Sequence, residues 1–208
     1  MSKLIVTIGR QFGSGGIDIG KKLADTLAIA FYDKELLTIA AQESGLCQEV
    51  FEKVDEHTTK GFSHIFPRGF TNMGVLMPHS DVLSNEKLFE LQSDAIRKLA
   101  KKESCVLVGR CADYILRDNP ACTSVFIHSN EPTRISRIMQ SKQVSQTQAK
   151  ELMVKTDKSR ATYYNYYTNK VWGTATSYSL AIDASVLGID GTAAFIASLI
   201  EQKAIAFG

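Results

Sequence analysis

The feature that most constrains the fold is a glycine-rich segment near the start of the chain, set between two apolar patterns. Residues 4–8 form a short, β-branched apolar run that is typical of a buried strand. Residues 9–16 contain four glycines, and Ile19, Leu23 and Leu27 then recur at the spacing of one helix face. The segment predicts a strand, a tight loop and a helix in direct succession, which is the opening unit of an α/β fold.

The same alternation continues along the chain. Apolar runs at residues 105–108 and 124–127 resemble buried strands, and a shorter run at 180–182 is a further candidate. The positions that mark helices between and after them are Leu88, Leu91, Ala95 and Leu99, then Phe195 and Leu199. We therefore expect one α/β domain of 208 residues, an open parallel sheet with helices on both faces.

The composition is that of a folded protein, with 44% hydrophobic and 22% charged residues. The net charge of +2 argues against the strongly basic surface of most nucleic-acid binders, so no nucleic-acid partner is expected. No run approaches the roughly 18 apolar residues of a membrane helix. The four cysteines lack a CxxC pair, which favours reduced thiols and a cytoplasmic location. The four histidines have no metal-ligand spacing, and no metal site is assigned to the chain.

The glycine-rich loop predicts a phosphate site formed by Gly13, Ser14, Gly15 and Gly16. Glycines tolerate positive φ and let backbone N–H groups converge on phosphate oxygens. The helix that follows offers the positive end of its dipole to the same anion. The alternative is a tight strand-to-helix turn without a ligand, but the glycines exceed what a plain turn requires.

The loop departs from the G-x-x-x-x-G-K-[ST] pattern at the positions that carry the charge and the metal-binding hydroxyl. With Gly15 as the second glycine, Arg10 stands where the first should be. Gly16 replaces the lysine, and residues 17–18, Ile and Asp, replace the serine or threonine. Another cation must then neutralise the transferring phosphoryl group, and Arg10 and Lys21 are the nearby candidates.

Five further elements follow the loop in order. They are Phe31-Tyr32-Asp33-Lys34-Glu35-Leu36; Val108-Gly109-Arg110; Phe126-Ile127 followed by Glu131-Pro132-Thr133-Arg134-Ile135-Ser136-Arg137; Asp157-Lys158-Ser159-Arg160; and Tyr178-Ser179-Leu180-Ala181-Ile182-Asp183. Together with the loop they resemble the cytidylate-kinase-like family, a branch of the nucleoside monophosphate kinases, over nearly the whole chain. One departure is Cys111, which stands where that family has the aspartate of a Gly-Arg-Asp element.

The resemblance implies a P-loop kinase body in three parts. These are a core at residues 1–38, 103–130 and 176–208, a monophosphate-binding insert at about 39–102, and a lid at about 131–175. It also implies transfer of a phosphoryl group from ATP, with Mg²⁺, to a nucleoside monophosphate, with CMP or dCMP the first acceptor to test. The expected partners are small-molecule nucleotides, with no membrane.

The candidate catalytic residues are Arg10, Arg137 and Arg160, and the candidate acceptor-binding residues are Asp33, Arg110 and Asp157. Arg110 follows a predicted strand at the edge where α/β sheets bind ligands, which favours contact with an acceptor phosphate over a surface ion pair. The lid arginines take their roles from the resemblance, and a solvated helix face is the alternative. For Asp33 the alternative is a helix cap.

Two segments interrupt the alternation, and two other functions stay open. Residues 56–84 predict a functional loop or insert, and residues 141–170 a polar, helical lid. The aromatic residues of that region favour core packing over stacking on a base: Tyr163, Tyr164, Tyr166, Tyr167 and Trp172. The alternatives to a nucleotide kinase are a kinase of another small molecule on the same fold, or a catalytically inactive nucleotide-binding regulatory module.

Overall fold

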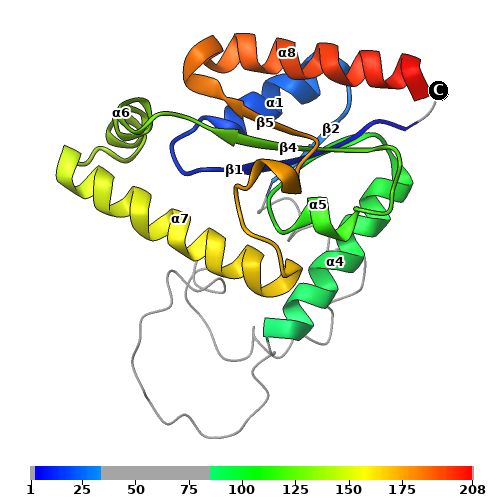
Figure 1. The fold of residues 1–208 in the computed structure, drawn as a ribbon, viewed down its shortest axis with the longest axis horizontal. Helices are drawn as coiled ribbons and strands as arrows, with labels where there is room; N and C mark the ends of the chain where they lie inside the picture. The colour runs from blue at the N-terminus through cyan, green and yellow to red at the C-terminus, as the bar shows by residue number, and fades with distance from the viewer. Residues whose placement is uncertain (1–2, 34–84, 208) are drawn as a thin grey trace, which may run out of the picture.

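The computed structural model describes residues 3–33 and 85–207, which form a five-stranded parallel sheet between layers of helices (Figure 1). The strands are β1 (Ile5–Arg10), β2 (Ala30–Tyr32), β3 (Cys105–Val108), β4 (Cys122–His128) and β5 (Leu180–Asp183). The described helices are α1 (Gly16–Leu27), α4 (Asn85–Lys102), α5 (Ala112–Ile115), α6 (Glu131–Lys142), α7 (Gln146–Thr168) and α8 (Ala184–Phe207), with a 3-10 turn η2 (Ala175–Ser177). The predicted α/β class is confirmed.

Strand β1 is the centre of the sheet, whose order is β2-β3-β1-β4-β5. Ile5 pairs with Cys105 of β3 on one side and with Cys122 of β4 on the other. Because all the strands are parallel, their carboxyl ends share one edge. The loop after β1, the turn after β3 and the start of α6 meet at that edge, which is where open α/β sheets bind ligands.

Alternate residues of β1 face opposite helical layers. Val6 packs in one cluster with Ile19 of α1 and Ile196 of α8. Ile5 points the other way and packs with Ile96 of α4. Each fully buried side chain of this size contributes about 1.5–3 kcal/mol relative to exposure, so the two layers hold the central strand firmly in place.

The buried helix faces match the sequence prediction in α1 but not in α8. Ile19 and Leu23 are buried, as their spacing predicts. Phe195, one of the two positions that predict the last helix, is 50% exposed, while Ile196 and Ile200 are buried. Helix α8 is apolar around much of its circumference, so spacing alone does not select the inward face.

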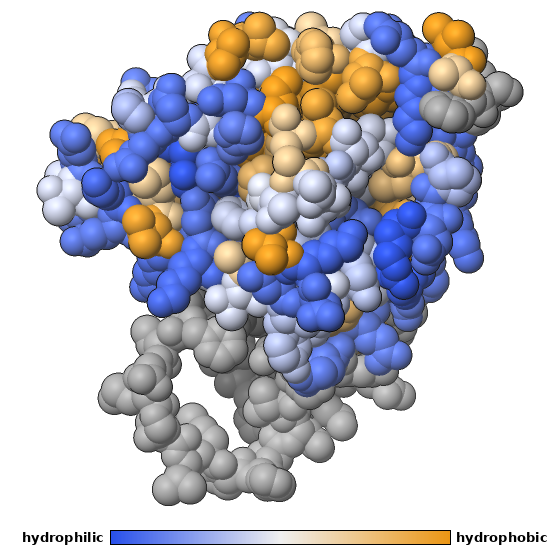
Figure 2. Space-filling model, viewed as in Figure 1, coloured by the Kyte–Doolittle hydropathy of each residue, from blue (hydrophilic) through white to orange (hydrophobic). Residues whose placement is uncertain are grey.

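The outer surface of α8 carries exposed apolar side chains, and this side of the molecule is largely orange, the colour of hydrophobic residues, in Figure 2. They include Val186, Leu187, Phe195 and Ile205. By length and composition alone, residues 184–206 are apolar enough to cross a membrane. The inner face of the helix packs on α1 and on the sheet. Core helices can have the same length and apolar composition.

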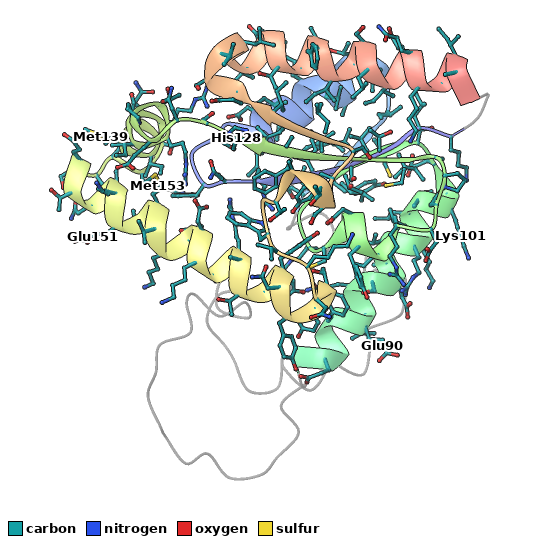
Figure 3. All side chains as sticks on the ribbon, viewed as in Figure 1. Glu90, Lys101, His128, Met139, Glu151 and Met153 are labelled. Atoms are coloured by element: carbon teal, nitrogen blue, oxygen red, sulfur yellow. The ribbon has the colours of Figure 1, made fainter. Side chains whose placement is uncertain are left out.

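Helices α6 and α7 form a pair that rests on the glycine-rich loop. Asn130 caps α6 by accepting a hydrogen bond from the amide of Thr133, at 2.9 Å. Ser145 and Gln148 form a capping box at the start of α7. Met153 lies between the two helices (Figure 3) in an apolar cluster that Phe12 of the loop joins. The predicted helical region is therefore placed directly against the predicted phosphate site.

Cysteine chemistry agrees with the prediction where it is described. Cys105, Cys111 and Cys122 are free thiols, and burial raises the pKa of Cys105 and Cys111 to about 12. Cys47 and the predicted loop at residues 56–84 lie outside the described residues.

Candidate active site

The loop after β1 needs glycine for steric and conformational reasons. At Gly9 a Cβ would lie 2.9 Å from the ring of Phe126. Gly13 and Gly15 have φ values of +77° and +83°, a region that side-chain-bearing residues rarely adopt. A Cβ on Gly13 would also lie 2.7 Å from the carbonyl oxygen of Arg134. The chain therefore turns back under α6 only because these positions carry no side chain.

The loop delivers backbone amides to the start of α1. The hydroxyl of Ser14 donates to the carbonyl of Gln11 at 2.9 Å, which closes the turn. In the first hydrogen bond of the helix, the amide of Ile19 donates to the carbonyl of Gly15, also at 2.9 Å. The amides that precede Ile19 have no intrahelical partner, and they lie at the positive end of the helix dipole. This is the arrangement that binds phosphate groups.

Three arginines of the α6–α7 pair hold alternate carbonyls of the loop. Arg160 donates to the carbonyl of Arg10 at 2.9 Å, Arg134 to that of Phe12 at 2.8 Å, and Arg137 to that of Ser14 at 2.6 Å. In a trans peptide the carbonyl and the next amide point in opposite directions, and the described residues contain no cis peptide. The amides of residues 13 and 15 therefore point away from the arginines that hold the preceding carbonyls.

Asp157 completes this support from α7. Its carboxylate accepts the amide of Phe12 at 2.8 Å and forms an ion pair with Arg134. The side chain of Arg134 is only 8% exposed and that of Asp157 only 17%, so the ion pair is well shielded from solvent. Both oxygens of Asp157 are engaged by the protein, which places this residue in the support of the loop.

Arg10 closes β1 and lies in a narrow space between two glycines. Its Cβ is 2.6 Å from the position that a Cβ on Gly16 would take, and its Nη1 would collide with a Cβ on Gly109. The Nε atom is buried and has no hydrogen-bond partner among the described residues. Burial, Arg160 and Arg110 lower the pKa of Arg10 to about 9, against a smaller opposing effect of Asp33. The guanidinium remains charged at neutral pH.

Arg110 approaches from the turn after β3. Gly109, Arg110 and Cys111 all have positive φ, at +84°, +55° and +55°, so the chain turns sharply as it leaves the sheet. The guanidinium of Arg110 lies 5.8 Å from the ring centroid of Tyr163. Burial lowers the pKa of Arg110, while Tyr163 raises it. A second basic group thus faces the same space as Arg10.

Arg160 brings a third guanidinium, from α7. It lies 5.6 Å from the ring centroid of Phe12. Burial lowers its pKa, Asp157 raises it and Arg134 lowers it. Arg110 and Arg160 both lie close enough to Arg10 to lower its pKa, so positive charge is concentrated around Arg10 at the carboxyl edge of the sheet.

The structure brings together most of the residues that the sequence singled out. The glycine-rich loop, Arg10, Arg110, Arg137, Arg160 and Asp33 all lie at this edge. Lys21, the other candidate cation, lies instead beside the ring of Phe31, with Nζ 5.9 Å from its centroid. The aromatic side chains mostly pack: Tyr167 stacks on Phe89 at 4.0 Å and Tyr164 is buried, although Tyr166 is exposed.

Arg134 is not among the site residues that the sequence predicts, although it lies in the arginine-bearing segment at residues 131–137. The signal that points to it is its spacing: Arg134 and Arg137 are three residues apart and therefore lie on one face of α6. Asp113 lies two residues after Cys111 in the sequence. In the structure it accepts a hydrogen bond from the hydroxyl of Tyr164 at 2.7 Å.

Comparison with known proteins gives matches in sequence profile and in fold. The profile of the cytidylate kinase-like family matches residues 5–186. No protein with a curated description matches the chain in sequence. A solved structure of an uncharacterized protein from Eubacterium ventriosum ATCC 27560 is 32% identical, with a TM-score of 0.70, and the match covers 96% of this chain and 99% of that chain.

Two further solved structures show the fold alone. Shikimate kinase from Bacteroides thetaiotaomicron is 15% identical with a TM-score of 0.54, covering 96% of this chain and 99% of that one. A gluconokinase from Sinorhizobium meliloti 1021 is 15% identical with a TM-score of 0.51, covering 99% and 98%. With the P-loop kinase fold and a profile match over most of its length, the chain belongs to the cytidylate kinase-like family.

Proposed function

We propose that this protein transfers the γ-phosphoryl group of ATP to a nucleoside monophosphate, with CMP or dCMP the first acceptor to test. The bond from the γ-phosphorus to its bridging oxygen breaks, and an oxygen of the acceptor phosphate forms the new bond. The products are ADP and a nucleoside diphosphate.

The observation that carries the proposal is the concentration of guanidinium groups around Arg10, beside the glycine-rich loop. Burial and then the nearby guanidinium groups of Arg160 and Arg110 lower the pKa of Arg10, because like charges nearby disfavour its charged form. Bringing like charges together costs free energy that a polyanion would recover. A triphosphate and a phosphorylated acceptor together supply that charge, whereas a neutral acceptor supplies less of it.

The residues take roles that phosphoryl transfer requires, because this chemistry depends on positioning and on charge stabilisation. The amides of residues 13–16 would hold the donor phosphates, with Arg137 and Arg160 reaching them from α6 and α7. Arg110 would bind the acceptor phosphate, and Asp33 would orient an acceptor hydroxyl. Asp157 would act through Arg134 and Phe12, keeping the loop in shape.

Magnesium enters this proposal as part of the substrate, MgATP. Ile17 stands near the position of the hydroxyl that binds the metal in the common loop pattern. No group of three metal-ligating side chains gathers in the described parts of the chain. The phosphates of the nucleotide would therefore provide most of the metal ligands. The proposed setting is the cytoplasm, with small-molecule nucleotides as partners.

A coupled assay of ADP release, with ATP, Mg²⁺ and a panel of acceptors, tests the proposal. The panel should contain CMP, dCMP, UMP, AMP and GMP, together with shikimate and gluconate. Turnover that is highest with CMP or dCMP supports the proposal. Turnover only with shikimate, gluconate or another unphosphorylated compound would instead identify a kinase of other small molecules. Binding of ATP without turnover of any acceptor would identify a nucleotide-binding module.

A further inference from the structure

The side chain of Arg10 and any side chain at position 16 compete for one space. A Cβ on Gly16 would lie 2.6 Å from the Cβ and 3.0 Å from the Cγ of Arg10. Real Cβ atoms essentially never approach another carbon this closely, and the Cβ of Arg10 is fixed to the backbone of β1. A lysine at position 16, as in the common loop pattern, is thus incompatible with Arg10 in its present position.

A second glycine clears the far end of the same side chain. A Cβ on Gly109 would collide with Nη1 of Arg10 and would lie 3.2 Å from Cζ. Gly109 directly follows β3, so the guanidinium extends from the start of α1 toward the neighbouring strand. It therefore spans the interval between the loop for the donor phosphates and the turn that carries Arg110.

We propose that Arg10 is the phosphate-binding cation of this loop, a replacement for the side chain absent at position 16, and that Gly16 and Gly109 are the paired positions that admit it. The proposal rests on the proposed function and names the residue that bridges donor and acceptor phosphates. The guanidinium can grip two phosphate oxygens at once, which a lysine ammonium cannot do with the same geometry.

The electrostatic environment of Arg10 is consistent with a ligand-binding role. Its Nε is buried and has no acceptor among the described residues, so one N–H group is left for a ligand. The nearest described charges include two further guanidinium groups, those of Arg110 and Arg160, and one carboxylate, that of Asp33. Arg134, by contrast, forms a direct ion pair with Asp157.

The test compares four variants with the wild-type protein: Arg10→Ala, Arg10→Gly, Gly16→Lys, and the double variant Arg10→Gly with Gly16→Lys. Calorimetric titration gives the Kd for ATP and for adenosine, and thermal unfolding gives stability. Arg97→Ala is the matched control, because Arg97 is a half-exposed arginine on α4 that pairs within its own helix. The control should bind ATP like the wild type.

Arg10→Ala and Arg10→Gly should weaken ATP binding at least tenfold and leave adenosine binding unchanged. Gly16→Lys alone should lower the unfolding temperature and weaken ATP binding, because the two side chains collide. The double variant should recover at least tenfold in ATP affinity over Arg10→Gly. An ATP affinity of Arg10→Ala within twofold of the wild type would overturn the proposal, and so would a Gly16→Lys protein as stable as the wild type.

The failure of this inference is distinguishable from the failure of the proposed function. If the wild type binds ATP but phosphorylates no acceptor, the proposed function fails, and the ATP affinities still decide the role of Arg10. If CMP is phosphorylated and Arg10→Ala keeps both its ATP affinity and its turnover, the function stands and Arg10 is a structural residue.

Discussion

Asp113 is a half-buried carboxyl group whose partners do not fully compensate its charge. The hydroxyl of Tyr164 donates to it at 2.7 Å. Burial raises the pKa of Asp113, while the Tyr164 hydrogen bond, local amides and Lys170 lower it by smaller amounts. The folded protein therefore favours the neutral acid more than the unfolded chain does.

The sign of the pH dependence follows from this direction. Between the unfolded pKa of about 3.9 and the raised folded pKa, the native state binds more protons than the unfolded state. The contribution of Asp113 to stability is therefore most favourable below about pH 4 and is lost as the pH rises through the folded pKa.

Asp113→Asn should be more stable than the wild type at pH 8 and gain little or nothing at pH 4. The gain should be about 1.4 kcal/mol for each unit by which the pKa is raised. Urea unfolding at the two pH values measures it. Asp118→Asn is the control, because the side chain of Asp118 is 87% exposed. An equal effect of Asp113→Asn at both pH values would contradict the prediction.

At the scale of elements, the junction between α6, α7 and the loop depends on the pair of Arg134 and Asp157. One residue comes from each helix, and both bond to the backbone of Phe12. Removing one partner of a shielded ion pair leaves the other charge uncompensated, which typically costs about 3–5 kcal/mol.

Arg134→Met should therefore destabilise the protein by about 3–5 kcal/mol, and the double variant Arg134→Met with Asp157→Leu by less than the sum of the single changes. Urea unfolding provides the free energies. The control is Lys150→Ala, because Lys150 and Glu131 join the same two helices at 3.0 Å with side chains 63% and 51% exposed. That change should cost below about 1 kcal/mol. Equal costs for Arg134→Met and Lys150→Ala would show that the shielded pair has no special role.

The elements that periodicity could predict are those that bury continuous apolar runs. Strands β1, β3 and β4 were predicted within a few residues because they bury continuous apolar runs, and the partly buried β5 was predicted from a shorter run. Strand β2 was not identified as a strand, since it has three residues, all partly buried, and too little pattern to register. Glycine spacing predicted the loop because positive φ has a strong residue preference.

Contacts between distant residues could not be predicted in the same way. The pair of Arg134 and Asp157 depends on how α6 crosses α7, which no local pattern records. Position 109 must be glycine because the side chain of Arg10 occupies the space beside it. These two residues are about a hundred positions apart in the sequence, and they meet only because β1 pairs with β3.

At the scale of the whole molecule, α6 and α7 rest on the carbonyls of the loop. If these helices act as a lid, Arg137 and Arg160 must turn from the carbonyls of Ser14 and Arg10 toward bound phosphates. We expect the amides of residues 141–170 to exchange hydrogen more slowly when ATP and CMP are both present, as detected by mass spectrometry. Helix α8 serves as the internal reference. Unchanged exchange in both regions at saturating nucleotide would contradict a lid.

The central position of β1 also determines when the sheet can form during synthesis. This strand leaves the ribosome long before its two partners, β3 and β4, which end at residues 108 and 128. At about 5–20 residues per second, the apolar strand waits on the order of ten seconds before either edge can be paired. The glycine-rich loop likewise has no α6 or α7 to hold it during that time. The nascent chain is thus an aggregation-prone species that a holdase chaperone would be expected to bind, and its folding rate should be limited by these long-range pairings.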